Sequence, residues 1–223
     1  ALQLVRSHVP DIIVSDVMMP RMNGYKLCKT IKENINISHI PVILLTARDD
    51  RQSQISGYKN GADGYLSKPF EVEMLMELIR NRLKNREYTK KRYLNAGLIP
   101  TPEESTISLT DETFLIKLNS IIQENIENSN LGIQFICQEV GLGRSSLYNK
   151  LKALTGMGAN EYISKLRIEK AITLISGTDM PFSEIAEKTG FTTPSYFSTT
   201  FKQYTGETPS QYKERKKKGL TDQ

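Results

Sequence analysis

The sequence contains few cysteines and histidines and no long apolar run. Cys28 and Cys137 are the two cysteines among 223 residues, which excludes a disulfide framework and is typical of proteins of a reducing cytosol. His8 and His39 are too few for a histidine-rich metal site. No apolar stretch approaches the roughly 18 residues that are needed to cross a bilayer. We therefore expect a cytoplasmic chain that makes no membrane contact of its own.

Charge permits several functions but selects none. The chain carries 30 Lys and Arg residues against 25 Asp and Glu residues, a net charge of +5. Residues 1–112 hold 16 of the basic and 14 of the acidic residues, and residues 113–223 hold the remaining 14 and 11. Neither half is strongly basic, so charge alone permits nucleic-acid binding without predicting it. Motifs must therefore indicate the function.

The first half of the chain alternates apolar runs with helical patterns. Continuous Ile, Val and Leu runs bounded by turn residues are typical of strands buried on both faces, and they occupy residues 11–16, 41–46 and 64–67. Apolar residues recur at helical spacing near residues 24–34, 51–60 and 71–84. This order predicts an α/β domain with a parallel sheet over residues 1–86. The chain opens on Ala1 with the tail of an amphipathic pattern, so we expect it to continue upstream.

The second half is helical and contains an internal repeat. Residues 87–112 are polar and hold two prolines towards their end, which predicts a linker. Between residues 113 and 218, a segment centred on Gly141 resembles a segment centred on Gly190, and apolar residues match in the helices that follow. Each copy has the pattern of a helix, a glycine turn and a second helix, which is a helix-turn-helix unit. We therefore predict an all-α domain with two such units, joined by one long amphipathic helix.

Three polar residues stand at the carboxyl ends of the predicted strands, namely Asp16, Thr46 and Lys68. In an open α/β sheet this edge is where ligands bind. The carboxylate can attack phosphorus, the hydroxyl can donate to a phosphoryl oxygen, and the ammonium can pair with its charge. An isolated aspartate at a strand end is better explained as the cap of the next helix. Three matching strand ends instead predict a site that handles an anion.

The residues around this site resemble a response-regulator receiver domain. The resemblance covers roughly residues 1–84 and rests on the segments Asp16–Gly24, Leu45–Ala47 and Gly61–Phe70. It implies that Asp16 is the phosphoacceptor and that Thr46 and Lys68 contact the phosphoryl group. It also implies that Tyr65 is the switch aromatic and that the peptide bond between Lys68 and Pro69 is cis.

Receiver domains also hold Mg²⁺, with the help of an acidic pair after a first strand that this sequence does not contain. The resemblance leaves Asp16 and the backbone carbonyl of Met18 as expected metal ligands. Mg²⁺ requires near-octahedral oxygen coordination, so we expect weak or absent binding by this chain and full binding in a complete receiver. We also expect an exposed edge beside the first predicted strand. The side chains of Met18, Met19 and Met22 are expected to pack in the core.

Two helices of the repeat combine an apolar stripe with a polar face. The stripes are formed by Leu147, Leu151 and Leu154 in the first copy and by Phe197, Phe201 and Tyr204 in the second. The opposite faces hold side chains that suit base edges in a major groove, namely Ser145, Tyr148, Asn149, Ser195, Ser198 and Thr199. Arg144, Lys152 and Lys202 suit phosphate contacts. A merely solvated face is the alternative for one copy, and the presence of two copies favours DNA reading.

The helical half resembles an AraC-type DNA-binding domain over about residues 115–216. The resemblance rests on Pro181–Phe197 and on the later pairs Phe201-Lys202, Thr205-Gly206, Thr208-Pro209 and Tyr212-Lys213. Lys213 stands where the family often has arginine, and the first copy matches less closely. Members of that family place both reading helices in successive major grooves. The resemblance therefore implies a bipartite DNA site whose elements lie about one helical turn apart.

Together the two resemblances imply a DNA-binding transcriptional regulator of a two-component phosphorelay, controlled by phosphorylation of Asp16 in the complete receiver. Without the first strand and its acidic pair, we expect this chain to be a poor phosphoacceptor. The implied partners are double-stranded DNA, a histidine kinase domain that the same polypeptide can carry, and a second copy bound through the face of residues 51–84. A parent protein of this kind can be anchored in the inner membrane. Two alternatives are a phosphorylation-dependent adaptor without DNA binding and a phosphohydrolase with Asp16 as its nucleophile. Haloacid-dehalogenase-type phosphohydrolases need a second acid where Met18 stands, so we expect no enzyme activity from this chain.

Overall fold

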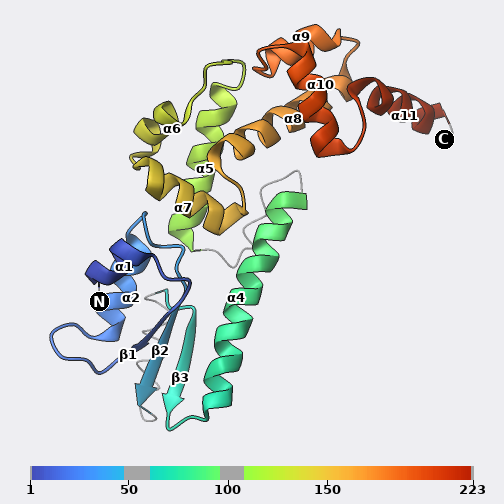
Figure 1. Cartoon of the computed structure of the whole chain (residues 1–223). Coiled ribbons are helices and arrows are strands. Elements are labelled where there is room, and N and C mark those ends of the chain that lie inside the picture. The colour runs from blue at the N-terminus through green and yellow to red at the C-terminus, as the bar shows by residue number, and fades with distance from the viewer. Residues whose placement is uncertain (1, 48–60, 96–107, 222–223) are drawn as a thin grey trace. The chain divides into compact units, whose positions relative to one another are not determined.

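The computed structural model describes residues 2–47, 61–95 and 108–221. The chain forms two compact units, of which the first comprises residues 1–115 with 145–156 and the second comprises residues 116–144 with 157–223. Figure 1 shows a three-stranded sheet with helices in the first unit, whereas the described part of the second unit is helical. The predicted order of an α/β domain followed by a helical domain is confirmed.

The sheet of the first unit is parallel. Its strands are β1 (Ile13–Asp16), β2 (Val42–Ala47) and β3 (Gly64–Lys68), in the order β1-β2-β3. The register places Asp16 opposite Leu45 and Thr46 opposite Ser67, so all three strands end at the same edge. The central strand β2 is buried along most of its length, as its continuous apolar run predicts. β1 pairs with β2 alone among the described residues, which confirms the exposed edge.

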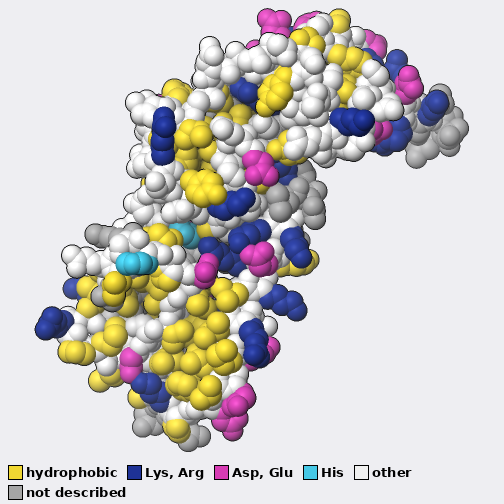
Figure 2. Space-filling model, in the orientation of Figure 1, with side chains coloured by type: hydrophobic (Ala, Val, Ile, Leu, Met, Phe, Trp, Pro, Cys, Tyr) yellow, Lys and Arg dark blue, Asp and Glu magenta, His cyan; other side chains and the backbone are white. Residues whose placement is uncertain are grey.

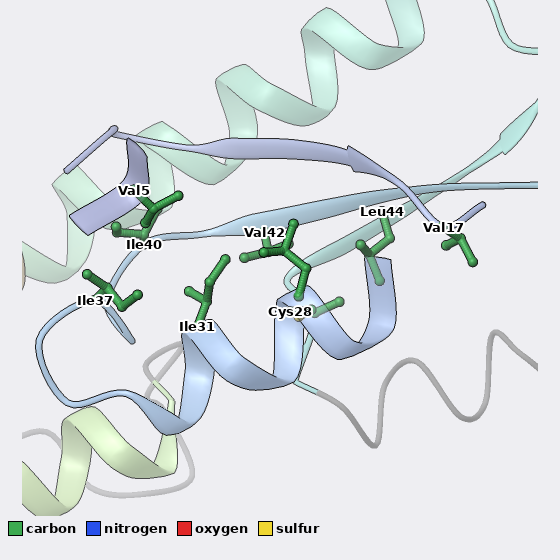
Figure 3. Close-up of a cluster of buried hydrophobic side chains, with 10 residues drawn as sticks. Val5, Val17, Cys28, Ile31, Ile37, Ile40, Val42 and Leu44 are labelled. Carbon is green, nitrogen blue, oxygen red and sulfur yellow. The ribbon is translucent and has the colours of Figure 1, made fainter. Parts of the chain in front are cut away.

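Two short helices flank the sheet, α1 (Leu2–His8) and α2 (Gly24–Glu33). Their apolar side chains form one core with β2 and the connecting loops (Figure 3), consisting of Val5, Val17, Leu27, Cys28, Ile31, Ile37, Ile40, Val42, Leu44 and Ala62. Cys28 is fully enclosed in this core, and burial raises the pKa of its thiol to about 11. Cys28 therefore packs as a small apolar side chain of this core.

Among residues 2–47 and 61–95, the opposite side of the sheet is less completely covered. Hydrophobic side chains gather over the sheet of the first unit in Figure 2, and Val14 of β1 is among the exposed ones. The helix α4 (Val72–Asn95) follows β3, and a Cβ atom on Gly64 would lie 3.3 Å from Leu78 of this helix. Gly64 therefore allows the helix to lie close to the strand.

The helix α4 is longer than the predicted helix at residues 71–84. Residues 85–95 contain no glycine or proline, and most of them are good helix formers. Glu87 and Lys90 form an ion pair of 2.6 Å one turn apart, which stabilises the extension. A polar, basic composition is thus compatible with an exposed helix as well as with a linker. The predicted helix at 51–60 and the middle of the predicted linker lie outside the described residues, and the domain boundaries stay predictions.

Seven helices lie within the described residues 108–221. They are α5 (Leu109–Glu124), α6 (Ile133–Val140), α7 (Arg144–Thr155), α8 (Ala159–Gly177), α9 (Phe182–Lys188), α10 (Pro194–Thr205) and α11 (Pro209–Thr221). The two predicted helix-turn-helix units are α6–α7 and α9–α10. Gly141 and Gly190, which end the first helix of each unit, both have φ of +71°, a conformation that favours glycine. No helix among the described residues has the length and hydropathy needed to cross a membrane.

The apolar core of the second unit is built around α8, α9 and α10. Its buried members are Ile168, Ala171, Ile175, Ile185, Ala186, Phe191, Phe197 and Phe201. The rings of Phe197 and Phe201 meet edge to face at 5.7 Å, as their positions on one stripe predict. The stripe also predicts that Tyr204 packs in the core, and this prediction is wrong. Tyr204 is 36% exposed, and its hydroxyl donates to the carbonyl of Glu161 at 2.9 Å. Its polar end keeps this ring at the surface.

Candidate functional site

The strand ends bring Asp16 and Lys68 into direct contact. The ammonium group of Lys68 donates to Oδ2 of Asp16, and the backbone amide of Met18 donates to Oδ1 at 3.0 Å. The Lys68 hydrogen bond, followed by the Met18 amide, lowers the pKa of the Asp16 carboxyl. Both side chains are partly open to solvent. The carboxylate is therefore ionised and accessible, as a nucleophile towards phosphorus must be.

The loop that follows β1 is held close to Asp16 by a glycine. A Cβ atom on Gly24 would lie 2.4 Å from the carbonyl oxygen of Asp16, so glycine is needed where α2 begins. Asn23 caps this helix, accepting a hydrogen bond from the amide of Lys26 at 2.9 Å. Met19 and Met22 pack against the core as expected. The packing expectation is wrong for Met18, whose side chain is 80% exposed because the backbone turns outward to reach Asp16.

Thr46 of β2 and Tyr65 of β3 are placed differently from Lys68. The hydroxyl of Thr46 is almost fully buried and donates to the carbonyl of Ala47 at 3.0 Å. None of the hydrogen bonds given for the described residues joins Thr46 to Asp16. Tyr65 is partly buried against the core of the first unit. The roles of Thr46 and Tyr65 in phosphorylation therefore stay predictions.

The edge of the sheet contributes few metal ligands. Asp16 supplies one carboxylate whose two oxygens are already engaged, and Met18 supplies a backbone carbonyl. Within residues 2–47, 61–95 and 108–221, no three acidic, histidine or cysteine side chains come together as a metal site would require. These residues do not fit a complete Mg²⁺ site. The peptide bond between Lys68 and Pro69 is cis, as the resemblance implied.

The helix α7 has the two faces that its sequence predicts. Leu147, Leu151 and Leu154 are buried. The positions proposed to meet DNA are exposed, and they are Arg144, Ser145, Tyr148, Asn149 and Lys152. Arg144 is not free to move, since its guanidinium donates to Oε1 of Gln134 at 3.0 and 3.2 Å. This contact ties the first residue of α7 to α6.

The helix α10 shows a similar division. Ser195, Thr199 and Lys202 are exposed and Ser198 is half-buried. Thr193 caps the helix by accepting from the amide of Tyr196 at 3.2 Å, and Pro194 occupies the first turn. Tyr196 is 53% exposed beside the predicted reading residues, and the sequence reasoning missed it. Its place in the first turn, next to Ser195, is the signal that points to it.

A buried ion pair involving α7 also escaped the sequence reasoning. Lys150 is fully buried, and its ammonium lies 2.5 Å from the carboxylate of Asp111 and 5.1 Å from the centre of the Phe114 ring. Asp111 lies within the predicted linker, although it belongs to α5. A lysine on a DNA-reading helix suggests a phosphate contact. Lys150 points inward instead and cannot make one.

Comparison with known proteins agrees with this division into two functional parts. The sequence profile of the response regulator receiver domain matches residues 1–80, and the profile of a helix-turn-helix domain matches residues 136–215. The C-terminal domain of the response regulator AraT from Geobacillus stearothermophilus is similar to 46% of this chain. The similarity covers 84% of that domain, at 30% identity and a TM-score of 0.43.

Two relatives are similar over most of this chain. The histidine kinase P4 of Formosa agariphila is 42% identical over 96% of this chain, which spans 16% of that protein's length. The probable transcriptional regulator ycf29 of Pyropia yezoensis is 30% identical over 72% of this chain and 78% of its own length. The two matched domains are those of a regulator rather than of an enzyme. The chain therefore belongs to the DNA-binding response regulators of two-component systems, with a receiver domain followed by an AraC-type helix-turn-helix domain.

Proposed function

We propose that phosphorylation of Asp16 controls the recognition of double-stranded DNA by α7 and α10. The observation that carries this proposal is the contact between Asp16 and Lys68 at the carboxyl edge of the sheet. It presents an ionised carboxylate beside a cation, where an incoming phosphoryl group meets both. The polar faces of α7 and α10 then bind the DNA.

The phosphoryl donor is a histidine kinase domain. A carboxylate oxygen of Asp16 forms the new bond to phosphorus while the bond from phosphorus to the imidazole nitrogen breaks, and that nitrogen keeps the electron pair. Lys68 then pairs with the phosphoryl charge. The hydroxyl of Thr46 exchanges its bond to the Ala47 carbonyl for one to a phosphoryl oxygen, and Tyr65 follows as the switch aromatic. Receiver domains generally bind Mg²⁺, and the residues described here would contribute Asp16 and the Met18 carbonyl to such a site.

DNA is read by two helices that differ in chemistry. Asn149 of α7 can pair with both hydrogen-bonding groups of an adenine edge, and Thr199 of α10 can bond several base edges. Lys152 and Lys202 contact phosphates and so hold the protein in register. Two reading helices on one chain require a bipartite site with its elements about one helical turn apart.

The partners follow from the same chemistry. The name of the Formosa agariphila relative supports a kinase domain in the same polypeptide. We further propose that the chain itself lies in the cytoplasm and that the whole protein is anchored in the inner membrane. A second copy binds through the face of residues 51–84. In the described part of that face, Val72, Met74 and Met76 expose apolar side chains that such a contact would cover.

Selection of duplexes from a randomised pool at near-physiological salt tests the DNA-binding half of the proposal. We expect enrichment of a bipartite motif by the folded chain. Absence of enrichment, with or without a small-molecule phosphodonor, would favour the adaptor alternative. Incubation of a longer chain that contains the complete receiver with phosphoramidate and Mg²⁺, followed by mass spectrometry, tests the other half, since phosphate should appear on the wild-type protein and not on Asp16→Asn. Phosphate on both proteins would place the acceptor elsewhere.

A further inference from the structure

A buried arginine of α8 joins the two helix-turn-helix units. Arg167 is 9% exposed, and its Nη2 donates to the carbonyl of Asn128 at 2.7 Å. Its guanidinium also lies 5.9 Å from the centre of the Phe191 ring. Asn128 lies in the turn between α5 and α6, whereas Phe191 lies in the turn between α9 and α10. One side chain therefore contacts the turns that precede α6 and α10.

The two turns approach each other without room for another side chain. A Cβ atom on Gly190 would lie 2.2 Å from the carbonyl oxygen of Ile126 and 2.8 Å from Nη2 of Arg167. Gly190 also has a φ of +71°, so its backbone favours glycine for a second reason. We call Ile126, Asn128, Arg167, Gly190 and Phe191 the joint. Close contact of this kind fixes an angle between two elements more firmly than a long flexible side chain could.

Stability alone is a poor explanation of Arg167. No carboxylate pairs with it in the described part of the chain, and its Nε has no hydrogen-bond partner there. Burial lowers the pKa of its guanidinium. Filling this space with an apolar side chain would avoid the cost of burying a charge. A directional group that is costly to bury is better explained by the geometry that it enforces.

Further hydrogen bonds hold α8 to α5 and α10. The hydroxyl of Tyr162 donates to Oδ1 of Asn119 on α5 at 2.8 Å. The hydroxyl of Tyr204 on α10 donates to the carbonyl of Glu161 at 2.9 Å. The helix α8 is thus attached to α5 and to α10, and Arg167 of the same helix contacts the turns that precede α6 and α10.

We infer that the joint sets the spacing between the two DNA elements that the protein accepts, and that Arg167 is a positioning residue for this specificity. The inference rests on the proposed DNA binding. The joint holds the turn that precedes α6 against the turn that precedes α10, and Arg144, which begins α7, donates to Gln134 of α6. One inserted base pair moves the second element by about 3.4 Å and turns it by about 35°. A rigid joint cannot follow that movement, so one reading helix loses its base contacts.

The test compares affinities of the full chain for three duplexes. The first is the bipartite duplex enriched by the wild-type protein, and the others carry one or two extra base pairs between its elements. We expect wild type to lose affinity by on the order of tenfold or more per insertion, since one mismatched base pair already costs about 5- to 150-fold. In Arg167→Met the loss should fall below about threefold. The ratio of two affinities, measured on one preparation, does not depend on how much of the protein is folded.

Lys170→Met is the matched control, since it removes the same charge from the same helix. Lys170 forms an exposed ion pair of 3.2 Å with Glu127, so we expect the wild-type spacing ratio. Phe191→Leu removes the ring from the joint and leaves an apolar side chain of similar size. It replaces Arg167→Met in the test if circular dichroism shows that Arg167→Met is unfolded. If a folded joint variant loses as much affinity per inserted base pair as wild type, or if Lys170→Met loses less, the inference is wrong. The proposed DNA binding would not be affected by either result. A wild-type chain that enriches no bipartite duplex would overturn the proposed DNA reading, and the inference with it.

Discussion

The ammonium group of Lys68 at the end of β3 is hydrogen-bonded to the carboxylate of Asp16 at the end of β1, although 52 positions separate them in sequence. This bond is the largest cause of the lowered pKa of Asp16. We therefore expect Lys68→Met to raise the pKa of Asp16 towards its ordinary value, with the Met18 amide retaining part of the shift. Titration of the Asp16 carboxyl carbon by NMR measures this.

Lys29→Met is the control for that titration. Lys29 pairs with Glu33 on the exposed side of α2 at 3.7 Å, so its loss removes the same charge without touching Asp16. The titration of Asp16 should then match wild type. An Asp16 titration that is identical in Lys68→Met and wild type would show that the ion pair does not persist in solution.

Gly24→Ala should destabilise the first unit. The added Cβ would lie 2.4 Å from the backbone oxygen of Asp16, which cannot move aside as a side chain could. Overpacking of this kind costs about 1–3 kcal/mol in the free energy of unfolding. Gly177→Ala is the matched control, because nothing lies within 4 Å of its added Cβ at the end of α8. Urea unfolding should show a lower midpoint for the first variant and an equal or higher one for the second.

Substitutions on the two reading helices should separate into two classes. Asn149→Ala and Thr199→Ala should relax the preference at single base positions, each by about 1–3 kcal/mol of discrimination. Lys152→Ala and Lys202→Ala should weaken binding to all sequences and reduce the salt slope by about 1 each. Binding to the enriched duplex and to its single-base variants at several salt concentrations distinguishes the classes. If all four variants behave alike, the division into base and phosphate contacts is wrong.

His39 should make stability depend on pH. Burial, followed by the nearby Lys150 charge, lowers its pKa from 6.5 to about 4. The folded protein therefore keeps the ring neutral over a range in which the unfolded chain takes up a proton. Stability falls as pH falls from about 6.5 to about 4, by up to about 3 kcal/mol. Urea unfolding at pH 7.5 and 4.5 should show a smaller difference for His39→Asn than for wild type, and equal differences would contradict the shift.

The parts of the structure that follow from periodicity could be predicted from the sequence. Three apolar runs gave the strands, and parallel strands must end at one edge, which brought Asp16 and Lys68 together. The repeat around Gly141 and Gly190 gave both helix-turn-helix units, because both turns need the same backbone conformation.

The features that could not be predicted depend on partners distant in sequence. Lysine is usually exposed in folded proteins, but Lys150 is buried because Asp111 neutralises its charge. The joint around Arg167 depends on two turns that meet only after folding. Composition alone was also misleading at two places. The apolar side chain of Met18 is exposed, and the charged segment after residue 86 continues the helix α4.

The length of α4 gives the first unit a mechanical property. The helix begins four positions after Lys68 and runs for 24 residues, about 36 Å. A tilt of about 10° at Val72 would displace Asn95 by about 6 Å, as on a lever arm of that length. Leu78, close to Gly64, and Arg86, which donates to the carbonyl of Asp11 at 3.2 Å, are the points on which the lever rests. A rigid α4 would therefore enlarge a small tilt at its start into a displacement several times larger at its far end.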